Sequence, residues 1–273
     1  MSQKTESILL RLLTYIAAIL TVATLLFLIA YILIKGIPYL KPSLFAWEYN
    51  TENVSLMPAL INTIVMVFLS LLVAVPMGVG SAIYLVEYAK KGSKLVELIR
   101  LTTETLSGIP SIIYGLFGYL LFVMQLGMGY SIHGGALTIS IMILPLIMRQ
   151  TEESLKAVPD LFREGSFGLG AGKLRTIFAI VLPTSIPGIL AGVILAIGRI
   201  VGETAALIYT SGTVAGIPSS VMGSGRTLAI HMYVLTNEGL YTNQAYATAV
   251  VLLVVVLGIN ALSAFAAKKL VKV

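Results

Sequence analysis

Long stretches without a formal charge constrain this sequence more than any other feature. The first covers residues 12–34, and the longest covers residues 105–148. A helix of the first length extends about 34 Å, enough to cross a hydrocarbon core about 30 Å thick. Unbroken apolar runs satisfy the backbone inside such a core as helices, whereas the strands of a membrane β-barrel alternate in polarity. The sequence therefore predicts an all-α integral membrane protein.

Composition supports this fold class and argues against catalysis. Hydrophobic residues make up 58% of the 273 residues and charged residues 11%, with a mean hydropathy of +0.96. The chain has no cysteine, and its two histidines are His133 and His231, which disfavours disulfides, iron–sulfur clusters and metal sites. The sequence contains no phosphate-binding loop, dinucleotide fingerprint, nucleophile elbow or zinc-binding His-Glu-x-x-His motif. We therefore expect a membrane protein that performs no covalent chemistry and has no metal or cofactor of its own.

The apolar runs predict six membrane-spanning helices. The glycine-rich stretch 127–135 divides the longest charge-free run into two. The expected spans cover about 12–34, 59–86, 105–126, 134–155, 182–208 and 245–267. No internal repeat or soluble insertion interrupts them, so we expect a single transmembrane domain over residues 1–273.

Lysine and arginine predict the orientation of these spans. Most of the 18 cationic residues flank the spans on one side: Lys4, Arg11, Lys90, Lys91, Lys94, Arg100, Arg149, Lys156, Arg163, Lys173, Arg175, Lys268, Lys269 and Lys272. The other side keeps Lys35, Lys41 and Arg226. The positive-inside rule then places both termini in the cytoplasm. In a membrane chain the net charge of +6 reports topology and contact with anionic lipid rather than nucleic acid.

The longest cytoplasmic segment contains a predicted short helix. Pro159 and Asp160 are typical of a helix start, and Gly168 or Gly170 would close the helix. Its apolar side chains are Leu161, Phe162, Phe167 and Leu169. An amphipathic helix over about 159–170, lying below the membrane domain, suits docking into a groove of a partner protein.

The same segment continues into a pattern of a glutamate, small residues and a Leu-Pro pair. Its members are Glu164, Gly165, Ser166, Gly170, Ala171, Leu182 and Pro183. Their spacing resembles the coupling-loop motif of ABC importer permeases, which usually has two alanines where this chain has Gly165 and Ser166. Small residues are kept there, although helix propensity is weaker. Residues 107–117 and 198–206 resemble the phosphate-specific, PstA-type branch, and the likeness extends over nearly the whole chain.

This resemblance implies a type I, MetI-like permease with a cytoplasmic coupling helix. It would form half of the translocation pathway of an ATP-driven importer for inorganic phosphate, in a bacterial or archaeal cell (inner) membrane. The implied partners are a second permease subunit of PstC type, a dimer of ATP-binding subunits of PstB type and a phosphate-binding protein of PstS type. ATP would be bound by the partner ATPase.

Two alternative functions stay open at this point. The chain could serve an importer of another oxyanion, such as molybdate or sulfate, because these anions share hydrogen-bonding chemistry with phosphate. It could also be a self-contained secondary transporter or channel. Six spans without a detectable inverted repeat offer no symmetric midplane site, which argues against the second alternative.

Arg199 is the first candidate for a substrate contact. It lies about 17 residues beyond Leu182, roughly 25 Å along a helix, and therefore within the membrane. An intramembrane charge costs on the order of 3 kcal/mol and normally faces a bundle interior or a water-filled cavity. Glu203 follows at i+4, where the two side chains could pair, and we include the adjoining Thr204 in the predicted pathway. The alternative is that both charges lie at the outer boundary or only lock helices together.

Arg149, near the inner boundary, is the second predicted pathway residue. A pair with Glu153, four residues on, is the structural alternative. The glycine-rich region 210–226 is expected to be an external loop or a partly re-entrant segment, and we expect Arg226 to contribute less to transport than Arg199.

Overall fold

The computed structural model describes residues 3–90 and 92–271, and every regular element in these ranges is helical. The α-helices are α1 (Gln3–Gly36), α2 (Met57–Ile83), α3 (Lys94–Ser107), α4 (Ser111–Gly118), α5 (Ile132–Lys156), α6 (Asp160–Gly168), α7 (Lys173–Thr176), α8 (Leu182–Gly202), α9 (Ala205–Thr210), α10 (Leu228–Glu238) and α11 (Thr242–Val271). Short 3-10 helices η1 (Ile37–Tyr39) and η2 (Pro42–Phe45) follow α1, and π-helical turns η3 (Tyr84–Tyr88), η4 (Tyr119–Gln125) and η5 (Ile177–Val181) adjoin α2, α4 and α8.

Five helical stretches in the described residues are long and apolar enough to cross a membrane: Ser7–Tyr39, Met57–Tyr88, Ile132–Lys156, Lys173–Gly202 and Thr242–Phe265. A sixth crossing exists if α3 and the stretch from α4 through η4 count as one broken span, because they meet at 101°. The bend falls before Pro110, which disfavours helical backbone in the preceding residue. The span expected over about 105–126 is therefore part of a bent pair of helices that begins at Lys94.

The fifth crossing begins at Lys173 rather than near Leu182. Residues 173–202 form one continuous helix, and the π-helical turn η5 lies directly before Leu182 and Pro183. A proline ring inside an α-helix clashes with the carbonyl four residues earlier, and a locally widened turn relieves that clash. Leu182 and Pro183 thus lie inside this helix rather than at its start.

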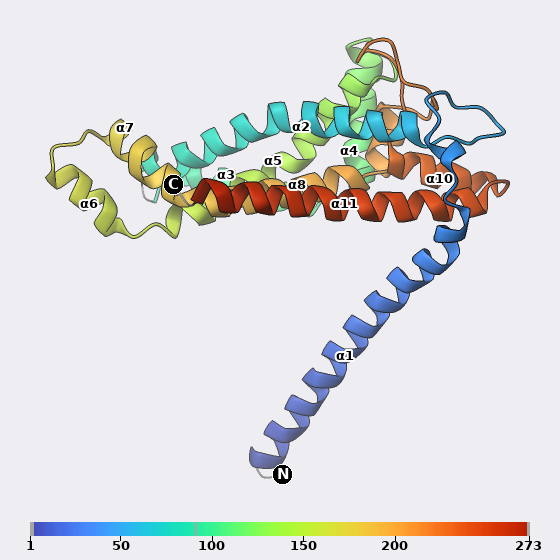
Figure 1. The fold of residues 1–273 in the computed structure, drawn as a ribbon. Coiled ribbons are helices and arrows are strands. Elements are labelled where there is room, and N and C mark those ends of the chain that lie inside the picture. The colour runs from blue at the N-terminus through green and yellow to red at the C-terminus, as the bar shows by residue number, and fades with distance from the viewer. Residues whose placement is uncertain (1–2, 91, 272–273) are drawn as a thin grey trace.

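Helix α5 lies at the centre of the bundle, flanked by α2 and α8, with α11 alongside α8 (Figure 1). Its buried side chains form one hydrophobic core with those of α2, α8 and α9. The core includes Met66, Ile139, Met142, Ile143, Ile147, Ile200 and Leu207. Ser140 fixes α5 to α2, since its hydroxyl donates to the Ser70 carbonyl at 3.1 Å. Interfaces of this kind rely on close packing and interhelical hydrogen bonds, because lipid competes equally for apolar surface.

Helix α1 stands away from the bundle along most of its length (Figure 1). It meets the bundle near its C-terminal end, where Gly36 lies against Tyr246 and Val250 of α11. Its apolar side chains from Ile8 to Ile34 are largely exposed. This long apolar surface requires lipid or another membrane protein around it.

Replacing Gly115 with valine should destabilise the packing of α4 on α9. A Cβ atom at Gly115 would lie 2.8 Å from the Cα of Ala206, a backbone atom that cannot rotate away. We expect a loss of about 1–3 kcal/mol from overpacking, measured as a lower Tm of the purified chain in nanodiscs. Gly80→Ala is the matched control, because a Cβ there meets no atom within 4 Å. An unchanged Tm in Gly115→Val would show that the two helices do not pack this closely.

Candidate functional site

Helix α6 extends from the end of the bundle that also holds the C-terminal end of α5 (Figure 1). It begins directly after Pro159, has Asp160 in its first turn and ends at Gly168. Gly170 follows with φ +82°, and its N–H donates to the Phe167 carbonyl at 2.9 Å. The Ala171 N–H donates to the Ser166 carbonyl at 3.1 Å, which completes a C-terminal cap of the Schellman type. Of the two closing glycines considered from sequence, Gly170 provides the left-handed residue.

The apolar side chains of this segment are exposed: Leu161, Phe162, Phe167 and Leu169, the last 91% exposed. Beside them lies a hollow of about 570 Å³ between α6 and the start of the fifth crossing. Its lining includes the predicted coupling residues Gly165, Ser166, Gly170 and Ala171. The fold brings these four together, whereas Leu182 and Pro183 lie further along the helix and outside the hollow. Glu164 is exposed on α6.

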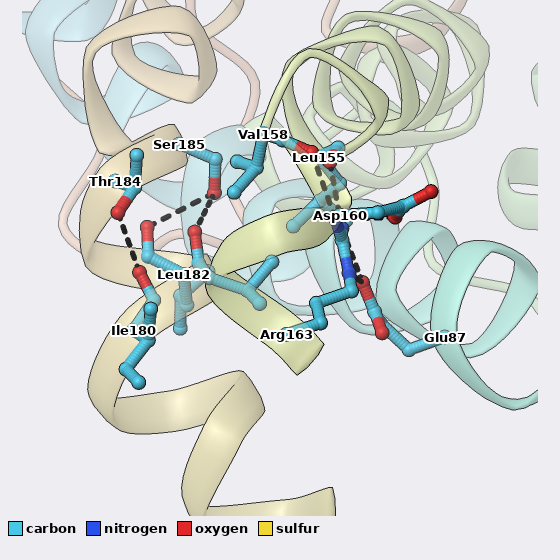
Figure 2. Close-up of polar contacts among 10 residues, drawn as sticks. Glu87, Leu155, Val158, Asp160, Arg163, Ile180, Leu182, Thr184 and Ser185 are labelled. Carbon is cyan, nitrogen blue, oxygen red and sulfur yellow. Dashed lines mark hydrogen bonds and ion pairs between the residues drawn. The ribbon is translucent and has the colours of Figure 1, made fainter. Parts of the chain in front are cut away.

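Arg163 anchors α6 to the bundle (Figure 2). Its Nη2 and Nε atoms donate to Glu87 Oε1 at 2.8 and 3.1 Å. Nη1 and Nη2 also donate to the carbonyls of Val158 and Leu155, at 2.8 and 3.0 Å, where α5 ends. The side chains of Arg163 and Glu87 are 14% and 9% exposed. Asp160 also accepts a hydrogen bond from Arg163, at 3.2 Å, but is 79% exposed.

Sequence reasoning missed this anchor. It counted Arg163 only as one of the cytoplasmic cations and did not single out Glu87. The two residues are 76 positions apart, so no helical periodicity relates them. The local signal is the i,i+3 spacing of Asp160 and Arg163, which predicts their own contact but not the buried one.

A second connection joins α6 to the fifth crossing. The hydroxyl oxygens of Ser166 and Thr176 are 2.8 Å apart and buried. Further along, the Thr184 hydroxyl donates to the Ile180 carbonyl at 2.6 Å, and the Ser185 hydroxyl donates to the Val181 and Leu182 carbonyls at 2.9 and 3.0 Å (Figure 2). The hydroxyls of Thr184 and Ser185 thus satisfy carbonyls in the distorted turn around Pro183.

Through Arg163 and Ser166, helix α6 is tied to the end of the second crossing and to the fifth crossing.

The predicted pair of Arg199 and Glu203 is wrong. Helix α8 ends at Gly202, so the i+4 relation along one helix is lost. Glu203 turns away in extended backbone, and its Oε1 accepts the Ala206 N–H at 3.0 Å at the start of α9. This hydrogen bond engages the Glu203 carboxylate in place of Arg199. Glu203 is buried. Arg199 is half-buried and joins no ion pair among the described residues.

Glu203 and Thr204 separate α8 from α9, directly after the fifth crossing ends at Gly202. Thr204 precedes α9, and its carbonyl accepts the Ile208 N–H at 3.0 Å. Non-helical backbone at membrane depth is tolerated where protein buries it or where it lines a cavity, and discontinuous helices commonly form transport sites. The break therefore brings three of the four predicted pathway residues to one structural feature: Arg199, Glu203 and Thr204.

Arg149 lies at a different level. Its Nε donates to Glu153 Oε1 at 3.1 Å, and both side chains are exposed, so the structural alternative considered from sequence is present. The adjoining Gln150 packs on Gly192 of α8. Arg199 is about two helical turns, roughly 10 Å, beyond that contact. The structure does not bring Arg149 to the helix break.

Arg226 lies in the predicted loop, between α9 and α10, but its side chain is only 4% exposed. Its guanidinium carbon lies 4.7 Å from the centre of the Tyr49 ring. Arg226 is therefore a buried member of the predicted loop, because the segment before α2 covers it. Its smaller contribution to transport stays a prediction.

Residues 74–272 match the family model of the binding-protein-dependent transport system inner membrane component. Among curated relatives, the probable ABC transporter permease protein YqgI of Bacillus subtilis is 33% identical over 82% of this chain and 81% of its own length. The phosphate transport system permease protein PstA 1 of Mycobacterium tuberculosis is 37% identical over 74% of this chain and 67% of its own length. PstA of Yersinia pestis is 36% identical over 72% of this chain and 69% of its length.

Solved structures show the same fold. A chain of a bacterial alginate ABC transporter aligns with a TM-score of 0.64 and 18% identity, over 93% of this chain and 95% of that one. A chain of the inward-facing MetNI methionine ABC transporter aligns with a TM-score of 0.61 and 19% identity, over 78% and 93% of the two chains. The predicted all-α, MetI-like permease architecture is confirmed. The chain belongs to the family of binding-protein-dependent transport system inner membrane components, the permease subunits of ABC importers.

Proposed function

We propose that this chain is a permease subunit of an ATP-driven importer of inorganic phosphate and forms half of its translocation pathway. Helix α6 carries the proposal: it presents exposed apolar side chains while a buried ion pair holds its other side to the bundle. A short helix of this kind fits a groove on a partner ATPase. Relatives 36–37% identical over about three quarters of this chain are named phosphate transport permeases, which supports the substrate.

Movement of the ATPase groove would displace α6 as a rigid lever. The Arg163–Glu87 ion pair leads from α6 to η3, which continues α2. The contact between Ser166 and Thr176 leads from α6 to the fifth crossing. Both crossings pack on α5, so one displacement of α6 would shift the helices on both sides of the central one.

The helix break after Gly202 would provide the substrate contact. The Arg199 guanidinium offers planar hydrogen-bond donors that suit a tetrahedral oxyanion, and Arg149 offers the same group nearer α6. Glu203 would act as a positioning residue, because its carboxylate holds the start of α9. Thr204 adds a hydroxyl at the break. Molybdate or sulfate would find the same donors, so substrate competition has to distinguish them.

The proposed assembly contains a second permease of PstC type, an ATPase dimer of PstB type and a binding protein of PstS type. The ATPase would bind ATP, which leaves this chain without a cofactor or a catalytic step. The end with α6 would face the cytoplasm, with both termini on that side, as the distribution of cations indicates. The exposed apolar surface of α1 would contact the second permease and lipid.

The lone chain should neither hydrolyse ATP nor move phosphate. It is reconstituted in liposomes with and without the ATPase, second permease and binding protein, and labelled phosphate uptake is followed. ATP-dependent uptake is expected only with all partners present. Uptake by the lone chain, driven by an ion gradient, would instead support the secondary transporter.

Arg199→Gln should lower phosphate uptake by about tenfold or more, because it removes a charged hydrogen-bond donor to the anion, and the loss of such a bond weakens binding by about that factor. The exposed Arg11→Gln in α1 is the control and should transport normally. Uptake is measured at matched abundance of the assembled complex, with sulfate and molybdate as competitors. Normal uptake in Arg199→Gln would leave the arginine with a structural role only.

Two variants of the α6 region should separate binding of the ATPase from coupling of ATP hydrolysis to transport. Leu169→Asp puts a charge on the most exposed apolar residue of this segment and should abolish co-purification of the ATPase. Glu87→Gln removes the buried charge and should preserve co-purification while lowering phosphate transported per ATP on the order of tenfold. Asp160→Asn, at the exposed contact of the same arginine, is the control and should behave as wild type. Coupled uptake in both Leu169→Asp and Glu87→Gln would contradict the role of α6.

A further inference from the structure

Three buried polar side chains without partners gather at the start of α10, at the end of the bundle opposite α6 (Figure 1). Arg226, Thr227 and His231 are 4%, 1% and 0% exposed. Arg226 Nε and Nη2, Thr227 Oγ1 and both ring nitrogens of His231 make no hydrogen bond of normal geometry with the described part of the chain. Buried polar groups are nearly always hydrogen-bonded, so such a cluster requires an explanation.

The backbone around the cluster is firmly held. The Arg226 N–H donates to the Val214 carbonyl at 2.9 Å, and the Leu228 N–H donates to Thr63 Oγ1 of α2 at 2.8 Å. The His231 N–H donates to the Thr227 carbonyl at 2.8 Å, one turn earlier in α10. The unpartnered side chains therefore extend from a backbone that hydrogen bonds hold in place.

The charge of Arg226 is not balanced by a carboxylate. None of the ion pairs among the described residues includes it. Its guanidinium lies on the Tyr49 ring, and the same ring meets His231 edge-on at 6.1 Å. An aromatic face compensates a buried cation only in part. Burial and the neighbouring Arg226 lower the pKa of His231 to about 3, against an opposing contact with the Val54 backbone. The imidazole is therefore neutral at pH 7 and retains one N–H donor, which lies near the backbone of the covering segment.

The segment that covers the cluster is strained. Val54, buried and five residues after Tyr49, has φ +46° and is the one non-glycine residue with positive φ in the described ranges. A β-branched residue rarely adopts this conformation, and such strain occurs often at ligand clamps. Asn50 holds the turn, since its Oδ1 accepts the N–H groups of Glu52 and Asn53 at 3.0 and 2.7 Å.

We propose that Arg226, Thr227 and His231 form a binding site for one small oxyanion, covered by the Tyr49 segment. All three side chains can donate to an anion. They come from the residue before the N-cap, from the N-cap and from the first turn of an eleven-residue helix, whose dipole adds positive potential. An anion would supply the missing hydrogen bonds and the missing negative charge at once. The choice of phosphate as the anion rests on the proposed function, which places this end of the bundle outside, where substrate enters. The Tyr49 segment opens to admit the anion.

Thermal unfolding of the purified full chain in nanodiscs, titrated with inorganic phosphate, tests this site. A ligand that binds only the folded state raises Tm in a saturable way, and we expect this in the wild type. In Arg226→Met the apparent affinity for phosphate should fall at least about tenfold. The same variant should melt higher than the wild type without phosphate, because an uncompensated buried charge has been removed.

Trp47 provides a second readout of the cover. It is the single tryptophan, is 68% exposed and lies two residues before Tyr49. Phosphate should change its fluorescence in the wild type and in the matched control Arg199→Gln, which should lose uptake in the complete transporter. The two proposals therefore fail separately: absence of phosphate uptake by the complete wild-type transporter contradicts the proposed function, whereas these titrations concern only the oxyanion site.

Three results would overturn the site. One is a wild-type chain that phosphate does not stabilise, and another is an Arg226→Met chain that phosphate stabilises as well as the wild type. The third is stabilisation by acetate equal to that by phosphate, which would assign the cluster to a carboxylate of a docking protein. If Arg226→Met melts below the wild type, Thr227→Val decides: weaker stabilisation by phosphate supports the site, and unchanged stabilisation overturns it.

Discussion

Water is absent from the centre of a membrane, so each polar group of this chain that lies there needs a partner inside the protein. The fifth crossing, residues 173–202, shows the consequence. Pro183 distorts the helix, and the hydroxyls of Thr184 and Ser185 take the carbonyls of the affected turn. Where the helix ends, Glu203 accepts an N–H of the next helix. Carbonyls at the distorted turn are thus paired inside the protein, and the helix end at Gly202 adjoins Arg199, the arginine proposed to meet the substrate.

The two ends of the bundle each contain a buried arginine, and the two differ in their side-chain partners. Arg163 has a carboxylate and two helix-end carbonyls around it, which fixes α6 although nine residues form a marginal helix on their own. Because polar contacts set the position of α6, its apolar side chains stay free for a partner. Arg226 has only the Tyr49 ring and buried groups without hydrogen bonds. A satisfied charge suits a rigid connection, and an unsatisfied one suits a ligand.

Features decided within a few residues of one another could be predicted from the sequence. The charge-free runs indicated the membrane helices, and Asp160 and Gly170 lie at the start and at the capped end of α6 as their residue types suggest. The pair of Arg149 with Glu153 was foreseen as an alternative, since both lie on one uninterrupted helix. Helical periodicity, proline and left-handed glycine act locally, so one sequence is enough to place them.

Only the tertiary structure decided which distant groups meet. Glu87 reaches Arg163 because the ends of α2 and α5 converge beside α6, and nothing in either local sequence specifies that convergence. Arg226 is buried because the segment before α2 folds over it. The helix end at Gly202 separated Arg199 from its expected partner, since the carboxylate gained a backbone N–H instead. The sequence by itself determined the helices and their apolar runs. Packing, and the competition among partners for each buried polar group, determined the sites.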